Sequence, residues 1–331
     1  MSTMPPSILT DEDRTYFQRE LDSFLPQKVF DAHCHLWSGE DVSWHIKGLP
    51  HDVGYREFQT LMQDIHPGRR TCGLFLPTFA HDKKHRLPQA NGWMGRQVEG
   101  VKDSVGAFFV TPEDDPEWVR QEVKRLKLRG LKCYHTFSSV TPTWEAQIPD
   151  YLPERLVKVA DQEGLFITLH MVRSRAVADP GNQKWIQHYC KNYPNMKLIL
   201  AHSARGFQPA HNLEGLHALK GLDNVYFDTS ANCEPMAHQA ILRIMGHKKL
   251  MYGTDLPVCH QRGRSVGVGD TFLWLYEETP VWKEKHIAIQ PPLIGYEHMR
   301  SLKWACWSER LSDSAVEDIF WNNAATLLDI Q

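Results

Sequence analysis

The feature that most constrains the fold is a regular alternation of short apolar runs with segments of helical periodicity. Strands that alternate with helices imply βαβ units and a parallel sheet. Eight such units predict a closed (β/α)8 TIM barrel, and 331 residues suffice for one with insertions. An open doubly wound sheet is disfavoured, because no strand is followed by a G-x-G-x-x-G turn. The eight predicted strands span 27–37, 72–79, 104–112, 128–136, 164–172, 197–203, 224–232 and 250–258.

The segments between these strands carry helix signals. Asp115 is a predicted N-cap for a helix over 115–127, which has proline at its first helical position. Apolar residues recur at helical spacing over 152–163. Pro180 begins another helix, and 234–247 has a proline in its first turn and a glycine near its end.

Three segments depart from a plain barrel, so we expect a distorted one. Residues 1–25 are predicted to form an N-terminal arm or helix, and 38–54 a long loop rich in His, Trp and Gly. Residues 281–331 are predicted to be a helical C-terminal extension packed on the barrel. The domain prediction is thus an arm over 1–25 and one barrel over 26–331.

Composition and charge exclude several classes of function. The formal net charge is −3 and no long basic run occurs, which argues against a nucleic-acid partner. No apolar run approaches the ~18 residues that a membrane span needs. The seven cysteines are scattered without C-x-x-C spacing, and the N-terminus lacks the pattern of a signal peptide. We therefore expect a cytoplasmic protein that acts on a small molecule.

The segment Asp31-Ala32-His33-Cys34-His35 is the first candidate for chemistry. Side chains at i and i+2 of a strand point to the same face, so His33 and His35 should project together, with Asp31 on that face as well. Two adjacent imidazoles can chelate one metal ion. Asp31 could then steer a ligand or a neighbouring backbone group. Alone, H-x-H is a weak signal, and two unrelated histidines would show the same pattern.

Three further residues end other predicted strands. His170 ends the fifth, His202 the sixth and Asp255 the eighth. Taken singly, each histidine could be a hydrogen-bonded core residue, and Asp255 an N-cap. In a parallel barrel, however, the C-terminal ends of all strands open on one face, so these side chains should converge there with the H-x-H pair.

The pattern of H-x-H after strand one, His after strands five and six, and Asp after strand eight resembles the amidohydrolase superfamily. The segments LAHSARGF, YGTDLPV and FWNNAATLL are similar to its amidohydrolase-related branch, which includes metal-dependent lactonases and decarboxylases. The resemblance covers roughly residues 27–331. It implies a metal-dependent enzyme and does not name the substrate.

The resemblance also implies roles for single residues. His33, His35, His170 and Asp255 correspond to the ligands of a mononuclear site, and His202 to the histidine that polarises the substrate or moves a proton. Asp255 would also accept the proton of the attacking water. Zn²⁺ is the first candidate for the ion and Mn²⁺ the second, since N/O ligands suit several divalent metals. The resemblance further allows a homodimer.

Lys132, at the end of the fourth strand, is open to several interpretations. In binuclear members of the superfamily a carboxylated lysine there bridges two metals, and His170 and His202 would then both bind the second ion. The favoured interpretation is a charge that orients a substrate carboxylate or pairs with Asp255. A structural ion pair is the third alternative.

Arginines near the predicted ligands indicate an anionic substrate, because a guanidinium binds a carboxylate through two hydrogen bonds. Arg205, three residues past His202, is the first candidate, although a loop arginine in solvent is the more ordinary role for any one of them. The other predicted substrate contacts are Lys132, Tyr134, His135, Trp37 and Arg173.

Three functions remain open at this point. The first is a hydrolase that activates water on a divalent metal to attack a lactone, ester or amide carbonyl. The second is a non-oxidative decarboxylase of a small aromatic or unsaturated acid, in which His202 protonates carbon. The third is a barrel that has lost catalysis and serves as a scaffold, which an intact ligand set disfavours.

Overall fold

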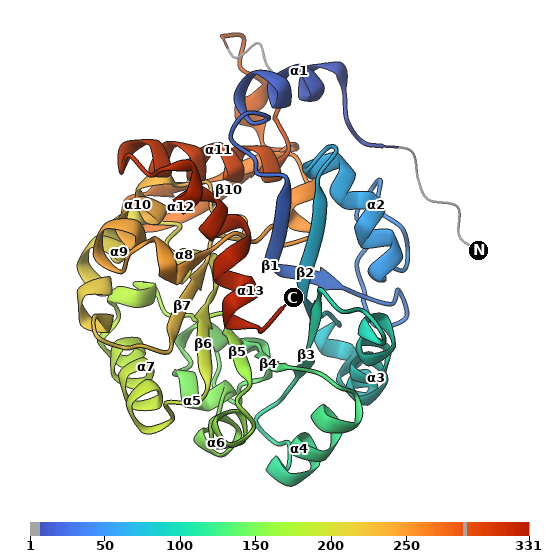
Figure 1. The fold of residues 1–331 in the computed structure, drawn as a ribbon, viewed down its shortest axis with the longest axis vertical. Coiled ribbons are helices and arrows are strands. Elements are labelled where there is room, and N and C mark those ends of the chain that lie inside the picture. Colours follow the sequence, from blue (N-terminus) through green and yellow to red (C-terminus); the bar gives the residue numbers. More distant parts are fainter. Residues whose placement is uncertain (1–6, 287–289, 331) are drawn as a thin grey trace.

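The computed structural model describes residues 7–286 and 290–330 and contains an eight-stranded parallel barrel surrounded by helices (Figure 1). The strands pair in sequence order, which confirms the eight predicted strands and the TIM-barrel fold. Their bounds are β1 Lys28–Leu36, β2 Arg70–Pro77, β3 Val105–Phe109, β4 Gly130–Cys133, β5 Phe166–Leu169, β6 Lys197–Leu200, β7 Val225–Asp228 and β8 Leu250–Met251.

Backbone hydrogen bonds close the ring between its first and last strands. The amide of Ala32 donates to the carbonyl of Tyr252 at 2.8 Å, and the amide of Asp255 donates to the carbonyl of His33 at 2.7 Å. The segment after β8 therefore lies beside β1. This contact brings Asp255 next to the H-x-H segment, 222 residues earlier in the chain (255 − 33).

The helices cover the outside of the barrel. Asp115 caps α4 by accepting a hydrogen bond from Trp118 N, and α6, α7 and α10 lie where the sequence predicts helices. No helix among the described residues has the length and apolar character that a membrane crossing requires. The helical bounds are α1 Asp11–Glu20, α2 Tyr55–Ile65, α3 Leu87–Val98, α4 Pro116–Arg125, α5 Ile148–Tyr151, α6 Glu154–Glu163, α7 Pro180–Asn192, α8 Ala201–Arg205, α9 Pro209–Gly215, α10 Pro235–Ile244, α11 Ile294–Ser308, α12 Asp313–Glu317 and α13 Asn323–Leu327.

The C-terminal helices close the base of the barrel, at the N-terminal ends of the strands. A π-helical turn joins α12 to α13, and this tail runs beside β1 and β8 (Figure 1). Its apolar side chains pack with inward-facing strand residues such as Phe30, Phe166 and Ile199. Within the predicted helical extension over 281–331, a short 3-10 helix spans Pro280–Lys283, and the longer helices begin at Ile294, after Pro291 and Pro292, which cannot continue a helix. Of that extension, 287–289 and 331 lie outside the described residues.

The N-terminal arm packs on this tail. Thr10 caps α1 and accepts a hydrogen bond from Asp13 N at 3.2 Å. The Tyr16 ring stacks on Tyr296 of α11 with centroids 6.0 Å apart. Residues 1–6 of the predicted arm fall outside the described part of the chain.

A two-stranded hairpin follows β8, and no prediction covers it. It comprises β9 (Gly263–Val268) and β10 (Thr271–Tyr276), which pair antiparallel. Its Phe272 ring stacks on Phe207 with centroids 4.5 Å apart. Since Phe207 follows β6, the hairpin covers part of the end where the strands finish.

Candidate metal centre

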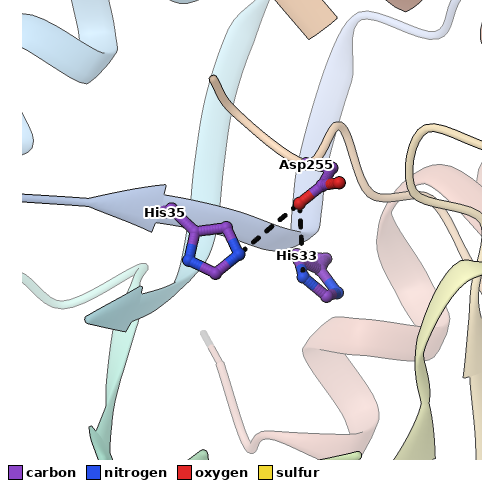
Figure 2. Close-up of side chains that lie close together, drawn as sticks. All are labelled: His33, His35 and Asp255. Atoms are coloured by element: carbon purple, nitrogen blue, oxygen red, sulfur yellow. Dashed lines mark ion pairs between the residues drawn. The ribbon is translucent and has the colours of Figure 1, made fainter. Parts of the chain in front are cut away.

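Three side chains meet where β1 ends and the chain leaves β8. Asp255 Oδ1 lies 3.4 Å from His35 Nε2 and 3.6 Å from His33 Nε2, and the three ligand atoms all lie within 4.8 Å of one another (Figure 2). Among the described residues this is the one group of three or more His, Cys, Asp or Glu with such spacing. Two imidazoles and a carboxylate suit Zn²⁺, Mn²⁺ and similar ions and leave coordination positions for water and substrate.

The protonation states favour a cation at this position. Burial lowers the pKa of both His33 and His35, so the imidazoles are neutral and keep lone pairs for a ligand. Burial opposes ionisation of Asp255, but hydrogen bonding to His35 and the surrounding histidines hold its pKa below the usual value. The carboxylate therefore remains charged beside two neutral nitrogen donors. That donor set fits a divalent metal ion.

A register shift in β1 directs the two histidines. The pairing with β2 slips between Asp31 and Cys34, so strict alternation of side chains is interrupted there. Asp31 does not bond either imidazole: its carboxylate accepts from Thr254 N at 2.8 Å and from Thr254 Oγ1 at 2.5 Å. Asp31 therefore anchors the backbone just before Asp255, which is the kind of contact expected if it steers a neighbouring backbone group.

His170 and His202 form a second pair at the same end of the barrel. His170 Nδ1 lies 3.0 Å from His202 Nε2, and His202 Nδ1 lies 3.0 Å from the Ser230 carbonyl. The His202 ring also lies beside His33, with centroids 5.0 Å apart. The structure thus brings together three of the four predicted ligands, while His170 contacts His202 and stands outside the tight group.

Asp228, at the end of β7, connects the two pairs and was not among the predicted site residues. Its Oδ2 accepts from His33 Nδ1 at 2.9 Å, and its Oδ1 accepts from the His202 amide at 3.0 Å. Although burial opposes ionisation, His33 and His202 lower the pKa of Asp228 to about 2. A carboxylate on Nδ1 fixes the tautomer of His33 so that its Nε2 faces Asp255. The missed signal was its position: Asp228 lies within the predicted strand 224–232 and ends the observed β7, in the same row of strand ends as His170 and His202.

Lys132 of β4 lies buried inside the barrel, with 2% of its surface exposed. Burial lowers the pKa of Lys132, while the charges of Asp255 and Asp228 oppose that shift. Within the described chain its ammonium forms no ion pair with a carboxylate, so the expected direct pair with Asp255 is not present.

Arg205 is half-buried beside this group without an acidic partner among the described residues. Its Nη1 donates to the Arg173 carbonyl at 2.9 Å, and its Cζ lies 5.6 Å from the centre of the Phe272 ring. Burial lowers the pKa of Arg205. A half-buried guanidinium that pairs with no carboxylate favours an anionic ligand.

The other predicted substrate contacts divide into two sets. Tyr134 lies with its ring 5.0 Å from that of His170, and His135 is 6.1 Å from the same ring. Burial lowers the pKa of His135 to about 4. In contrast, Trp37 is buried and donates to the His51 carbonyl, and Arg173 pairs with Asp179 at 2.9 Å. The indole N–H of Trp37 and the Nε of Arg173 are therefore already hydrogen-bonded within the protein and are not free to bind a substrate.

Residues 30–330 match the family model described as amidohydrolase. The chain belongs to the amidohydrolase family. The family predicted from the sequence is therefore confirmed. No curated protein sequence matches the chain.

Solved structures share the fold of this amidohydrolase at low identity. An amidohydrolase from Burkholderia multivorans is 15% identical with a TM-score of 0.56, over 92% of this chain and 99% of that one. 5-Carboxyvanillate decarboxylase from Sphingomonas paucimobilis is 14% identical with a TM-score of 0.54, over 92% and 100%. A protein from Acinetobacter baumannii that carries the name 2-pyrone-4,6-dicarboxylic acid hydrolase is 14% identical with a TM-score of 0.56, over 91% and 99%. The similar structures thus include both reaction classes that the sequence leaves open.

The metals bound in such structures differ. The Burkholderia multivorans amidohydrolase has also been solved with bound zinc. The 5-carboxyvanillate decarboxylase of Novosphingobium aromaticivorans has been solved with manganese and a nitrobenzoic acid.

The backbone of this amidohydrolase turns left-handed directly after β6. His202, Ser203, Ala204 and Arg205 have φ values of 58°, 52°, 57° and 55°. Each such residue costs roughly 1–2 kcal/mol when it is not glycine. Asn232 Nδ2 donates to the His202 carbonyl at 3.1 Å, and other buried contacts assist. Strain of this kind persists where the surrounding structure holds it, and it clusters at functional sites.

Proposed function

We propose that the chain is a metal-dependent hydrolase that attacks a lactone, ester or amide carbonyl of a small carboxylated substrate. The observation that carries the proposal is the meeting of His33 Nε2, His35 Nε2 and an Asp255 oxygen within 4.8 Å. A divalent cation bound by these residues, Zn²⁺ first and Mn²⁺ second, supplies Lewis acidity that activates water and a carbonyl oxygen. His170 is the proposed fourth ligand, and Nε2 is the ring nitrogen that its contact with His202 through Nδ1 leaves for this role.

The chain's own residues then have separate tasks. Asp255 remains ionised, so its carboxylate can accept the proton of the attacking water. His202 is proposed to polarise the scissile carbonyl from its position between His33 and His170. Arg205 binds a substrate carboxylate, since its half-buried guanidinium has no acidic partner among the described residues. Lys132 adds a second positive charge on the same side.

The alternative reaction is decarboxylation at the same site. Arg205 and Lys132 would hold an acid there equally well, and His202 would deliver its proton to carbon. A decarboxylase is among the similar structures, which supports decarboxylation as the second proposal. Carboxylation of Lys132 with a second metal ion is the less favoured arrangement of the centre.

One experiment separates these proposals. The purified protein is analysed for bound metal, loaded in turn with Zn²⁺ and Mn²⁺, and offered carboxylated lactones and aromatic acids. We expect one ion per chain and ring opening of a lactone without release of CO₂. Release of CO₂ from an aromatic acid would replace hydrolysis by decarboxylation, and two ions per chain would favour the lysine bridge. If the purified protein binds no metal ion, both proposed reactions are refuted, and the alternative of a non-catalytic scaffold is favoured.

A further inference from the structure

The left-handed turn after β6 is made of side-chain-bearing residues where glycine is the ordinary choice. Glycine adopts positive φ without the clash that a Cβ creates. Four successive residues, His202 to Arg205, nevertheless have φ between 52° and 58°. The chain therefore keeps side chains at positions where they strain the backbone. A reason for keeping them should be visible in their contacts.

The geometry of the turn places its first and last residues on one side. In a left-handed turn, as in its right-handed mirror image, residues i and i+3 are neighbours. The contacts agree, because the His202 ring lies 5.5 Å from Phe207 and the Arg205 guanidinium carbon 5.6 Å from Phe272. Those two aromatic rings stack on each other with centroids 4.5 Å apart. His202 and Arg205 thus approach the same wall of the barrel mouth, which is the end of the barrel where the C-terminal ends of the strands open.

The second residue of the turn points into a buried polar network. Ser203 Oγ lies 2.7 Å from His238 Nδ1 of α10. His238 Nε2 lies 2.9 Å from the Asn232 carbonyl and 3.0 Å from Ser301 Oγ of α11. Burial lowers the pKa of His238 to about 4, so its neutral ring donates at Nε2 and accepts the Ser203 hydroxyl at Nδ1. Ser203 and His238 are both fully buried.

Two more buried amides hold the same turn. Asn212 Nδ2 donates to the Ser203 carbonyl at 2.9 Å, and Asn232 Nδ2 donates to the His202 carbonyl at 3.1 Å. Ala204 is equally buried, but its methyl group has no polar atom to contribute. Ala204 therefore shares the strain of the turn without sharing the network, and it provides a matched control.

We propose that Ser203 and His238 are positioning residues, whose buried hydrogen bond holds the left-handed turn in the conformation that presents His202 and Arg205 to the same substrate. This inference rests on the proposed function only in taking the barrel mouth as the substrate site. Neither residue touches substrate. Their effect passes through the backbone of the turn to the side chains on either side of Ser203.

The test uses the metal-loaded full chain with two variants that break the bond and one that does not. Ser203→Ala removes the hydroxyl, and His238→Gln removes the acceptor while its amide can still reach the Asn232 carbonyl. Ala204→Gly relieves strain at the next residue and leaves the bond in place. Isophthalate is the dicarboxylate probe, with affinity measured by calorimetry, and turnover is measured on the substrate that the wild-type protein uses.

We expect Ser203→Ala and His238→Gln to keep the metal and to lose ~10- to 100-fold in kcat/KM, the scale of misplaced catalytic groups. Probe affinity should fall toward that of Arg205→Ala, and Ala204→Gly should match the wild type. Adding Ser203→Ala to Arg205→Ala should weaken the probe little further, because the two changes act through one contact. A merely structural role would give additive losses.

Two results would overturn the proposal. One is unchanged probe binding and turnover in both Ser203→Ala and His238→Gln. The other is a loss in Ala204→Gly equal to that in Ser203→Ala. If Ser203→Ala does not fold, His238→Gln carries the same comparison. A wild-type protein that turns over nothing would defeat the proposed function, whereas the probe-binding comparison would still decide the role of Ser203.

Discussion

The two ends of this barrel are built on opposite principles. At the base, apolar strand side chains such as Phe30 and Phe166 pack with Leu327 of the C-terminal helix α13. At the mouth, imidazoles and carboxylates are buried beside one another, and the backbone has positive φ at Asp255 and along the turn from His202. The base therefore stabilises the fold. The mouth lowers the free energy of unfolding, because it holds polar groups and a strained backbone in fixed positions.

The largest effect is expected from a double substitution that alters the mouth and leaves the packing of the base unchanged. His33→Ala combined with His35→Ala should remove the metal and reduce turnover by at least ~10³-fold, because metal-ion catalysis supplies several kcal/mol. The free energy of unfolding of the metal-free protein should also fall, because the buried carboxylate of Asp228 loses the hydrogen bond from His33. Metal analysis, steady-state kinetics and urea unfolding measure the three quantities. A full metal complement in the double variant would refute the ligand assignment, and His217→Ala at an exposed histidine is the control.

The converse change is made at the base. Phe166 is 1% exposed and packs in the apolar cluster there. Phe166→Ala should lower the free energy of unfolding by ~3–5 kcal/mol through loss of buried surface and creation of a cavity. Turnover per folded molecule should stay near the wild-type value. Urea denaturation measures the loss, with Trp307→Ala as the control because Trp307 is 80% exposed. Equal damage to activity and stability would show that the two ends are not separable.

A smaller effect sharpens the role of Asp228 at the mouth. Asp228→Asn keeps the shape of the side chain and removes the charge that orients His33. Metal affinity should fall ~10- to 100-fold, as for other carboxylates behind a metal-bound histidine. Competition with a chelator of known affinity measures the change. Unaltered affinity would mean that the packing of His33 is enough to orient it.

The effect that is smallest at neutral pH concerns a buried histidine away from the mouth. His66 lies 2.8 Å from the Tyr252 hydroxyl through Nε2, and burial lowers its pKa to about 3. The unfolded state therefore binds a proton near pH 6.5 that the folded state does not. Stability is fully present above that pH and falls by up to ~1.4 kcal/mol per pH unit as the pH drops toward 3. His66→Asn should flatten the curve of unfolding free energy against pH, and His217→Asn should not.

Much of the fold was readable because each signal is local. Strand count and order follow from hydrophobic periodicity, and α4 follows from Asp115 with its proline. The hairpin of β9 and β10 carried a readable signal as well, since Gly269 and Asp270 form a two-residue connection between alternating segments. Strand ends were less accurate: β8 stops at Met251 because the Tyr252 amide bonds to the Ile319 carbonyl instead.

The candidate site was predictable in its membership but not in its geometry. His33, His35 and Asp255 lie together because the strand ends of any parallel barrel meet. The register shift beside Asp31 and the left-handed turn at His202 depend on tertiary contacts from β8, α10 and α11. Such contacts have no local signature. The partners of Arg173 and Trp37 are likewise set by loops distant in sequence, so these residues could not be told apart from Arg205 in advance.

The closure of the ring between β1 and the segment after β8 has a consequence for synthesis. A nascent chain makes His33 and His35 early and Asp255 more than 200 residues later (255 − 33 = 222). β1 therefore cannot pair with the segment after β8 until that segment has been synthesised. The C-terminal helices that close the base are synthesised later still. The proposed trio of ligands is complete only once Asp255 has been synthesised, so the binding of an ion by all three residues must follow translation of the greater part of the chain.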